Sequence, residues 1–144
     1  MSRLDECTLT KLKRMEGPNG SLSPLYSGVD IPFNIKRAYY LYDIPGGAER
    51  GGHAHRRLQQ FVVAASGSFA ITLDDGVGRR KISLDRSYYG LYLPSMIWRE
   101  ITDFCSGAIC LVFASSPYDE ADYIRDYQEF LDAVRGSADE CDDA

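Results

Sequence analysis

The chain has 144 residues, of which 44% are hydrophobic and 12% aromatic, which is enough to build one packed domain and too apolar for a disordered chain. Sixteen Lys and Arg against 21 Asp and Glu give a net charge of −5, which argues against nucleic acid as a partner. No run reaches the roughly 18 apolar residues of a membrane-spanning helix, and four cysteines without Cys-x-x-Cys spacing, after a charged start unlike a signal peptide, predict a reduced cytoplasmic protein.

Short strand-like runs separated by Gly, Pro, Asp and Ser occupy the first 114 residues, with no internal repeat and no linker. Many short strands at this spacing are typical of a β-sandwich or barrel. The stretches 66–68 and 74–76 predict tight turns, because their glycines can adopt the positive φ that such turns need. The predicted strands cover 8–14, 21–26, 34–43, 60–66, 68–74, 80–85, 90–93, 97–102 and 107–114.

The last third of the chain changes to a helical period. Its apolar positions form one stripe from Tyr123 to Val134, and Gly136 is a plausible helix C-cap. The sequence therefore predicts a single domain over 1–136 that ends in one amphipathic helix. The acidic residues that follow predict a disordered tail over 137–144.

The only two histidines of the chain, His53 and His55, are two residues apart in the segment 50–55. On extended backbone, residues i and i+2 point to the same face, so both imidazoles would enter one space. Histidine, with a pKa of about 6.5, moves protons at neutral pH and is also the commonest metal ligand. The pair therefore predicts either a metal site or a proton-transfer site, against the plainer alternative of two solvated rings at a strand end.

A His-x-His pair in a small double-sheet protein suggests the cupin form of the jelly roll. In metal-binding cupins a Glu follows the pair, a Gly follows that Glu, and another His arrives on a later strand. Here Gln60 stands at the Glu position, Gly67 is kept, and the segment after Pro94 offers Arg99 instead of a histidine. Two imidazoles and an amide bind a divalent ion poorly, and a fixed cation repels one. We therefore predict no metal and no other cofactor.

Two neighbouring segments offer further candidates. Alternation along 35–42 puts Arg37 and Tyr39 on one face of a strand and Tyr40 on the other. A tyrosine facing a cavity would hold a sugar oxygen or relay a proton, although packing is the commoner role. Trp98 would stack on a base or sugar or else belong to the core. Glu100, two residues later, would share its face and orient an imidazole or an arginine.

Several motifs together resemble one family, the dTDP-4-keto-6-deoxyglucose 3,4-ketoisomerases, over about residues 20 to 134. This resemblance implies a cupin-type double-stranded β-helix (jelly roll) with one C-terminal α-helix. It also implies a metal-free homodimer with exchanged N-terminal strands, which acts on a dTDP-linked 4-keto-6-deoxyhexose in deoxysugar and polysaccharide biosynthesis. The resemblance depends on Ile31-Pro32-Phe33-Asn34-Ile35-Lys36-Arg37-Ala38-Tyr39-Tyr40, Arg50-Gly51-Gly52-His53-Ala54-His55, Gly90-Leu91-Tyr92, Trp98-Arg99-Glu100 and Ser116-Pro117-Tyr118-Asp119-Glu120-Ala121-Asp122-Tyr123-Ile124-Arg125.

By position, the family's catalytic base matches His53, its partner histidine His55 and its active-site tyrosine Tyr39. Arg99 favours the gluco product, because a histidine there would protonate one face of the sugar whereas an arginine only anchors an oxygen. The pattern has Arg or Tyr where this chain has Asn19. The expected substrate-binding residues are Asn19, Arg37, Arg50, Gln60, Trp98, Arg99 and Glu100.

Three other functions compete with this interpretation. A nucleotide-sugar 3,5-epimerase would use a similar fold and a histidine base. A metal-dependent cupin oxygenase is disfavoured by Gln60 and Arg99. A non-catalytic sugar-nucleotide-binding cupin would bind the same ligand without converting it.

Overall fold

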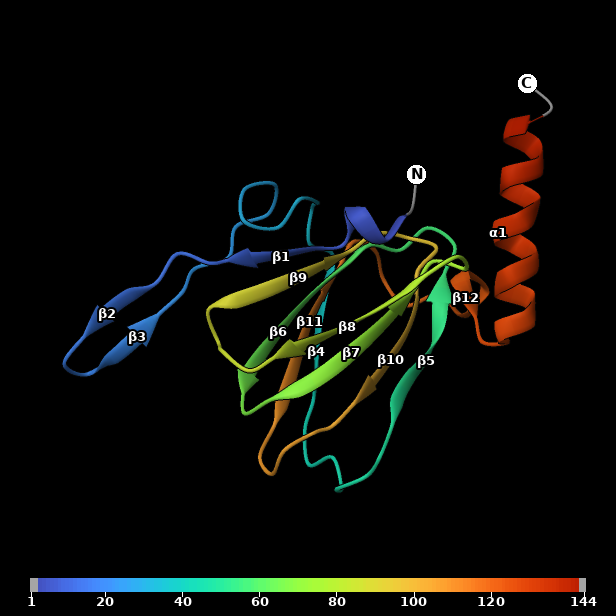
Figure 1. The fold of residues 1–144 in the computed structure, drawn as a ribbon. Helices are drawn as coiled ribbons and strands as arrows, with labels where there is room; N and C mark the ends of the chain where they lie inside the picture. The colour runs from blue at the N-terminus through green and yellow to red at the C-terminus, as the bar shows by residue number, and fades with distance from the viewer. Residues whose placement is uncertain (1–2, 143–144) are drawn as a thin grey trace.

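The computed structural model describes residues 3–142, which form two five-stranded sheets face to face and one helix outside them (Figure 1). All paired strands in these sheets are antiparallel. The first sheet has the order β1 (Thr8–Lys11), β9 (Tyr89–Leu93), β6 (Gln60–Ser66), β11 (Ile109–Ala114) and β4 (Arg37–Leu41). The second has the order β12 (Tyr123–Ile124), β5 (Arg50–His55), β10 (Trp98–Thr102), β7 (Phe69–Asp74) and β8 (Arg79–Leu84). The predicted all-β fold with one C-terminal helix is confirmed.

The remaining elements are short, apart from the helix. A hairpin of β2 (Met15–Gly17) and β3 (Gly20–Leu22) follows β1 and extends away from the two sheets (Figure 1). Two 3-10 turns, η1 (Arg3–Glu6) and η2 (Glu120–Asp122), precede β1 and β12. The helix α1 runs over Tyr127–Asp142.

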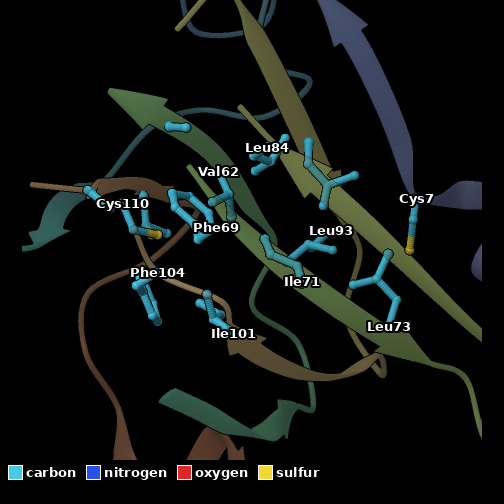
Figure 2. Close-up of a cluster of buried hydrophobic side chains, with 14 of the residues drawn as sticks. Cys7, Val62, Phe69, Ile71, Leu73, Leu84, Leu93, Ile101, Phe104 and Cys110 are labelled. Carbon is cyan, nitrogen blue, oxygen red and sulfur yellow. The ribbon is translucent and has the colours of Figure 1, made fainter. Parts of the chain in front are cut away.

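The main core fills the space between the sheets (Figure 2). Strand β7 contributes Phe69, Ile71 and Leu73, each at most 2% exposed, and Val62 of β6 and Leu93 of β9 pack against them. Full burial of one such side chain stabilises the fold by about 1.5–3 kcal/mol. On the outer face of the first sheet, the segment 23–36 packs its apolar side chains over β6 and β11. The strand predicted over 21–26 is therefore short, and β3 ends at Leu22.

Two glycines are required by the geometry of the strands. Gly51 has φ +81°, at the point where the register between β5 and β10 shifts, so it supplies the left-handed residue of a β-bulge. Gly90 lies under the ring of Phe61, and a Cβ there would stand 2.1 Å from two ring carbons. Both predicted turns are present, with Gly67 and Gly76 at positive φ between their strands.

The C-terminal region departs from the prediction at both ends of the helix. Tyr123 and Ile124, expected in the helical stripe, form β12, because their backbone pairs with the edge strand β5 before α1 begins at Tyr127. The helix also does not end at Gly136, as expected, but runs to Asp142, whereas the division into a domain over 1–136 and a disordered tail over 137–144 stays a prediction. The helix continues because one internal glycine costs only about 1 kcal/mol. Residues 143–144 lie outside the described residues.

Candidate active site

A cavity of about 530 Å³ lies between the two sheets and is lined from both of them. Its floor is apolar and includes Val62, Ile71 and Leu93. Its walls and mouth carry the polar and charged side chains of both sheets and of the segment before α1. These are Arg37, Tyr39, Glu49, Arg50, His53, Gln60, Arg99, Tyr118, Tyr123 and Arg125.

The histidine pair lies on the last residues of β5, and the two rings are in direct contact. Their Nε2 atoms are 3.1 Å apart, and the ring planes are nearly perpendicular, at 86°. The predicted sharing of one space is therefore correct in part. His53 lines the cavity, whereas His55 is fully buried behind it.

The second ring nitrogen of His55 contacts Asp122, a residue that sequence reasoning did not select. Asp122 Oδ2 lies 3.2 Å from His55 Nδ1, and the carboxylate also accepts hydrogen bonds from the backbone N–H groups of Arg57 and Leu58, at 2.8 and 3.2 Å. The only signal for this role was the place of Asp122 in the family motif 116–125. Glu100, the carboxylate expected to orient an imidazole, does not line the cavity.

Arg99, Gln60 and Tyr39 form a hydrogen-bonded chain across the cavity from β10 to β4. Arg99 Nη1 donates to Gln60 Oε1, and Gln60 Nε2 donates to the Tyr39 hydroxyl at 2.9 Å. Arg99 is only 2% exposed, and its Nη2 has no hydrogen-bond partner. An unpaired buried donor costs about 1–3 kcal/mol, so Nη2 is well suited to receive an oxygen atom of a ligand.

Burial sets the charge state of the residues around this chain. Burial, and then the positive charge of Arg99, lowers the pKa of His53 to about 2 and that of His55 to about 3. Burial also raises the pKa of Tyr39 and lowers that of Arg99 to about 10. At neutral pH the cavity therefore combines neutral imidazoles and a protonated phenol with a charged guanidinium.

The mouth of the cavity is basic and aromatic. The Arg125 guanidinium lies 4.2 Å from the centroid of the Tyr123 ring and is held by Glu120 at 2.7 and 2.9 Å. Arg37 lies over the Tyr39 ring, and its Nε is buried without a hydrogen-bond partner. Guanidinium groups bind phosphate, and aromatic rings stack on bases or sugars. Sequence reasoning missed Tyr118, Tyr123 and Arg125, because residues after position 116 reach the mouth only through the turn into β12.

The structure brings Arg37, Tyr39, Arg50, His53, Gln60 and Arg99 to the cavity, as predicted, and places Arg37 and Tyr39 on one face of β4. Trp98 and Glu100 do not line it. They alternate with Arg99 along β10 and so face outward, where the Trp98 ring packs on Phe130 and Tyr127 of α1.

Asn19 also lies outside the cavity of its own chain. It occupies the turn between β2 and β3, and this hairpin projects from the sheets (Figure 1). Trp98, Glu100 and Asn19 therefore do not line the cavity of this chain. Their contacts with a substrate stay predictions.

Two features are absent from the part of the chain that the structure describes. No group of three His, Cys, Asp or Glu side chains is arranged to hold a metal ion in this part of the chain. None of its helices is long and apolar enough to cross a membrane.

The fold is cupin-like, with a cavity between its two sheets, and comparison with known proteins gives the family. Residues 5–135 match the model described as FdtA: WxcM-like, C-terminal. The chain belongs to this family, and it is an isomerase.

Three relatives show how close the similarity is. The TDP-4-oxo-6-deoxy-α-D-glucose-3,4-oxoisomerase of Aneurinibacillus thermoaerophilus is 42% identical over 125 residues, 87% of this chain and 90% of the relative. The 3,4-ketoisomerase QdtA of Thermoanaerobacterium thermosaccharolyticum, a histidine-to-asparagine mutant in complex with TDP-4-keto-6-deoxyglucose, has a TM-score of 0.88 and 37% identity over 90% of this chain and 94% of its own. The TDP-quinovose 3,4-ketoisomerase WlaRB of Campylobacter jejuni has a TM-score of 0.84 and 44% identity over 87% and 96%.

Proposed function

We propose that this protein is a sugar-nucleotide 3,4-ketoisomerase that converts TDP-4-keto-6-deoxyglucose into the TDP-linked 3-keto-6-deoxyhexose. The observation that carries the proposal is the neutral, cavity-lining His53 backed by a buried second imidazole. Three relatives named for 3,4-keto-sugar isomerisation support it. The basic and aromatic mouth of the cavity supplies groups that suit a nucleoside diphosphate.

The mechanism follows from the acidity that the C4 ketone confers on C3–H. Neutral His53 removes the C3 proton, and the electrons move toward O4 to give an enediol. The hydroxyl at O3 loses its proton and O4 gains one, and Tyr39, a protonated phenol on the cavity wall, serves this exchange. Return of a proton to C4 leaves the ketone at C3. General acid–base catalysis of this kind contributes about 10²–10⁴ in rate.

Arg99 supports a gluco configuration at C4 of the product. Its guanidinium stays charged and lacks an acidic proton to deliver at neutral pH, so its free Nη2 holds a sugar oxygen instead. The proton then reaches C4 from the His53 side. The product expected on this basis is TDP-3-keto-6-deoxyglucose, in line with the quinovose named for one relative.

The test is to incubate the protein with TDP-4-keto-6-deoxyglucose labelled with ¹³C in the sugar, and to follow the ketone carbon by NMR. We expect the ketone signal to move from C4 to C3. In D₂O, deuterium should enter the sugar without exchange at C5, whereas a 3,5-epimerase would exchange C3 and C5. Binding without any change in the sugar spectrum would contradict the proposal and favour a non-catalytic binding protein.

We also propose a homodimer in which the β2–β3 hairpin reaches the partner subunit and brings Asn19 to its cavity mouth. The hairpin carries exposed apolar side chains at Met15 and Leu22, which free solvent does not favour. Light scattering should give twice the chain mass, about 32 kDa against 16.1 kDa for one chain. Deletion of residues 15–22 should give a monomer with impaired turnover, and an active monomer would contradict the exchange.

A further inference from the structure

Three side chains form a hydrogen-bonded row that leads from a buried carboxylate to the cavity. Asp122 Oδ2 lies 3.2 Å from His55 Nδ1, and His55 Nε2 lies 3.1 Å from His53 Nε2. Asp122 is 8% exposed and His55 is fully buried, so only His53 meets the cavity. A neutral imidazole carries one N–H. The nitrogen that carries the hydrogen on one ring therefore determines which nitrogen carries it on the next ring.

The backbone fixes Asp122 as the acceptor end of this row. Its Oδ1 accepts from the N–H of Arg57, and its Oδ2 accepts from that of Leu58. The oxygen that faces His55 therefore requires a hydrogen on Nδ1 of that ring. His55 Nε2 is then unprotonated and accepts, so His53 Nε2 must donate. Nδ1 of His53 is left with its electron pair free.

We infer that Asp122 is a positioning residue that acts through His55 to present His53 as a base at Nδ1. The catalytic meaning of this inference rests on the proposed function, whereas the ring tautomers do not. When His53 takes the C3 proton at Nδ1, it keeps its Nε2–H on His55, and His55 keeps its Nδ1–H on the carboxylate. The new positive charge, which Arg99 disfavours, is stabilised along the row by Asp122 without a further proton transfer.

The sharpest variant is Asp122→Asn, which keeps the shape and replaces one acceptor oxygen by an NH₂ group. The contact to Arg57 N–H is the shorter of the two backbone contacts, at 2.8 Å, so the amide oxygen is expected to stay there. The NH₂ group then donates to His55 Nδ1 and moves the hydrogen of that ring to Nε2. His53 must accept at Nε2 and carry its hydrogen on Nδ1, which removes the base.

The matched control is Asp119→Asn in the same turn. Asp119 caps η2 by accepting from the N–H of Ala121 at 3.1 Å, and asparagine caps equally well. With only two histidines in the chain, ¹⁵N-resolved NMR reports both tautomers, and a His53→Gln variant assigns the signals. We expect wild type and Asp119→Asn to show Nδ1–H on His55 and Nε2–H on His53. Asp122→Asn should show the reverse.

Turnover gives the second measurement. Asp122→Asn should lower kcat by about 10²–10⁴ while KM changes less than about threefold, because Asp122 does not line the cavity. A wild-type spectrum with Nε2–H on His55 would overturn the inference even if the variant does not fold. Full turnover by a folded Asp122→Asn would overturn it as well. Wild-type protein that fails to convert TDP-4-keto-6-deoxyglucose would defeat the proposed function and leave the tautomer result standing.

Discussion

Two buried aspartates connect the C-terminal part of the chain to the second sheet, and each accepts three hydrogen bonds. Asp122 accepts from two backbone N–H groups and from His55. Asp74, at the end of β7 and 3% exposed, accepts from Gly76 N–H, from Arg79 Nε and from the Tyr127 hydroxyl at 2.6 Å. The two carboxylates are alike in burial and in the number of their partners.

The two aspartates differ in what their partner side chains, His55 and Tyr127, contact in turn. Past His55 comes His53 and the cavity, so a change at Asp122 reaches the site of chemistry. Past Tyr127 comes the packing of α1, through Tyr127 and Phe130, on Trp98, which does not line the cavity. A buried carboxylate with several donors is therefore not evidence of function by itself. Whether such an aspartate has a role in catalysis or in stability depends on the side chain that it contacts.

The largest expected effect is on turnover, and it comes from changing His53, the residue at the cavity end of the row that begins at Asp122. His53→Asn removes the base, so kcat should fall by about 10²–10⁴, the usual contribution of a general base. The free energy of unfolding should change by less than about 1 kcal/mol, because His53 borders an open cavity. Initial rates by NMR and urea unfolding measure the two quantities. More than a tenth of wild-type turnover in the variant would rule out His53 as the base.

The corresponding change on the structural side is Asp74→Asn. Loss of the charged acceptor for Tyr127 should lower the free energy of unfolding by about 1.5–3 kcal/mol. Arg79 adds little to this figure, because it is 62% exposed and its ion pair is screened by water. Urea unfolding measures the loss, and kcat should stay within about twofold of wild type. A large loss of turnover at unchanged stability would contradict the structural role assigned to Asp74.

Acid should lower the stability of the protein through the histidine pair. The pKa of His53 is about 2 in the folded protein against about 6.5 unfolded, so below pH 6.5 the unfolded chain binds a proton that the folded one does not. Stability is therefore lost as the pH falls from 6.5. His53→Gln should reduce this dependence by up to about 1.4 kcal/mol per pH unit between pH 6.5 and 4.5, measured by urea unfolding at each pH. Identical slopes for wild type and variant would contradict the depressed pKa.

The smallest expected effect measures how much the Tyr127 hydroxyl contributes to the stabilisation by Asp74. Tyr127→Phe deletes one hydroxyl and leaves Asp74 its other two donors. The free energy of unfolding should fall by about 1 kcal/mol, the usual net value of one hydrogen bond. Thermal unfolding of the variant checks this figure, with turnover unchanged. A loss as large as that of Asp74→Asn would show that the hydroxyl provides most of the stabilisation by this carboxylate.

Sequence reasoning succeeded where a local period decides the outcome. Alternation along β4 was enough to put Arg37 and Tyr39 on the cavity face, and the same parity along β10 separates Arg99 from Trp98 and Glu100. The resemblance had offered Trp98, Arg99 and Glu100 of β10 alike as substrate contacts. Parity allows only Arg99 to face the cavity, because its two neighbours point to the opposite side of the sheet.

The amino-acid sequence by itself determined the strand-rich fold, the histidine pair on extended backbone, and the replacement of two metal-ligand positions by Gln60 and Arg99. These follow from residue type and spacing over a few positions. Only the tertiary structure decided that Asp122 meets His55 across 67 positions, and that Tyr123 leaves the helical stripe to pair with β5. Contacts of that range depend on how a turn and an edge strand meet in space, which a local pattern does not encode.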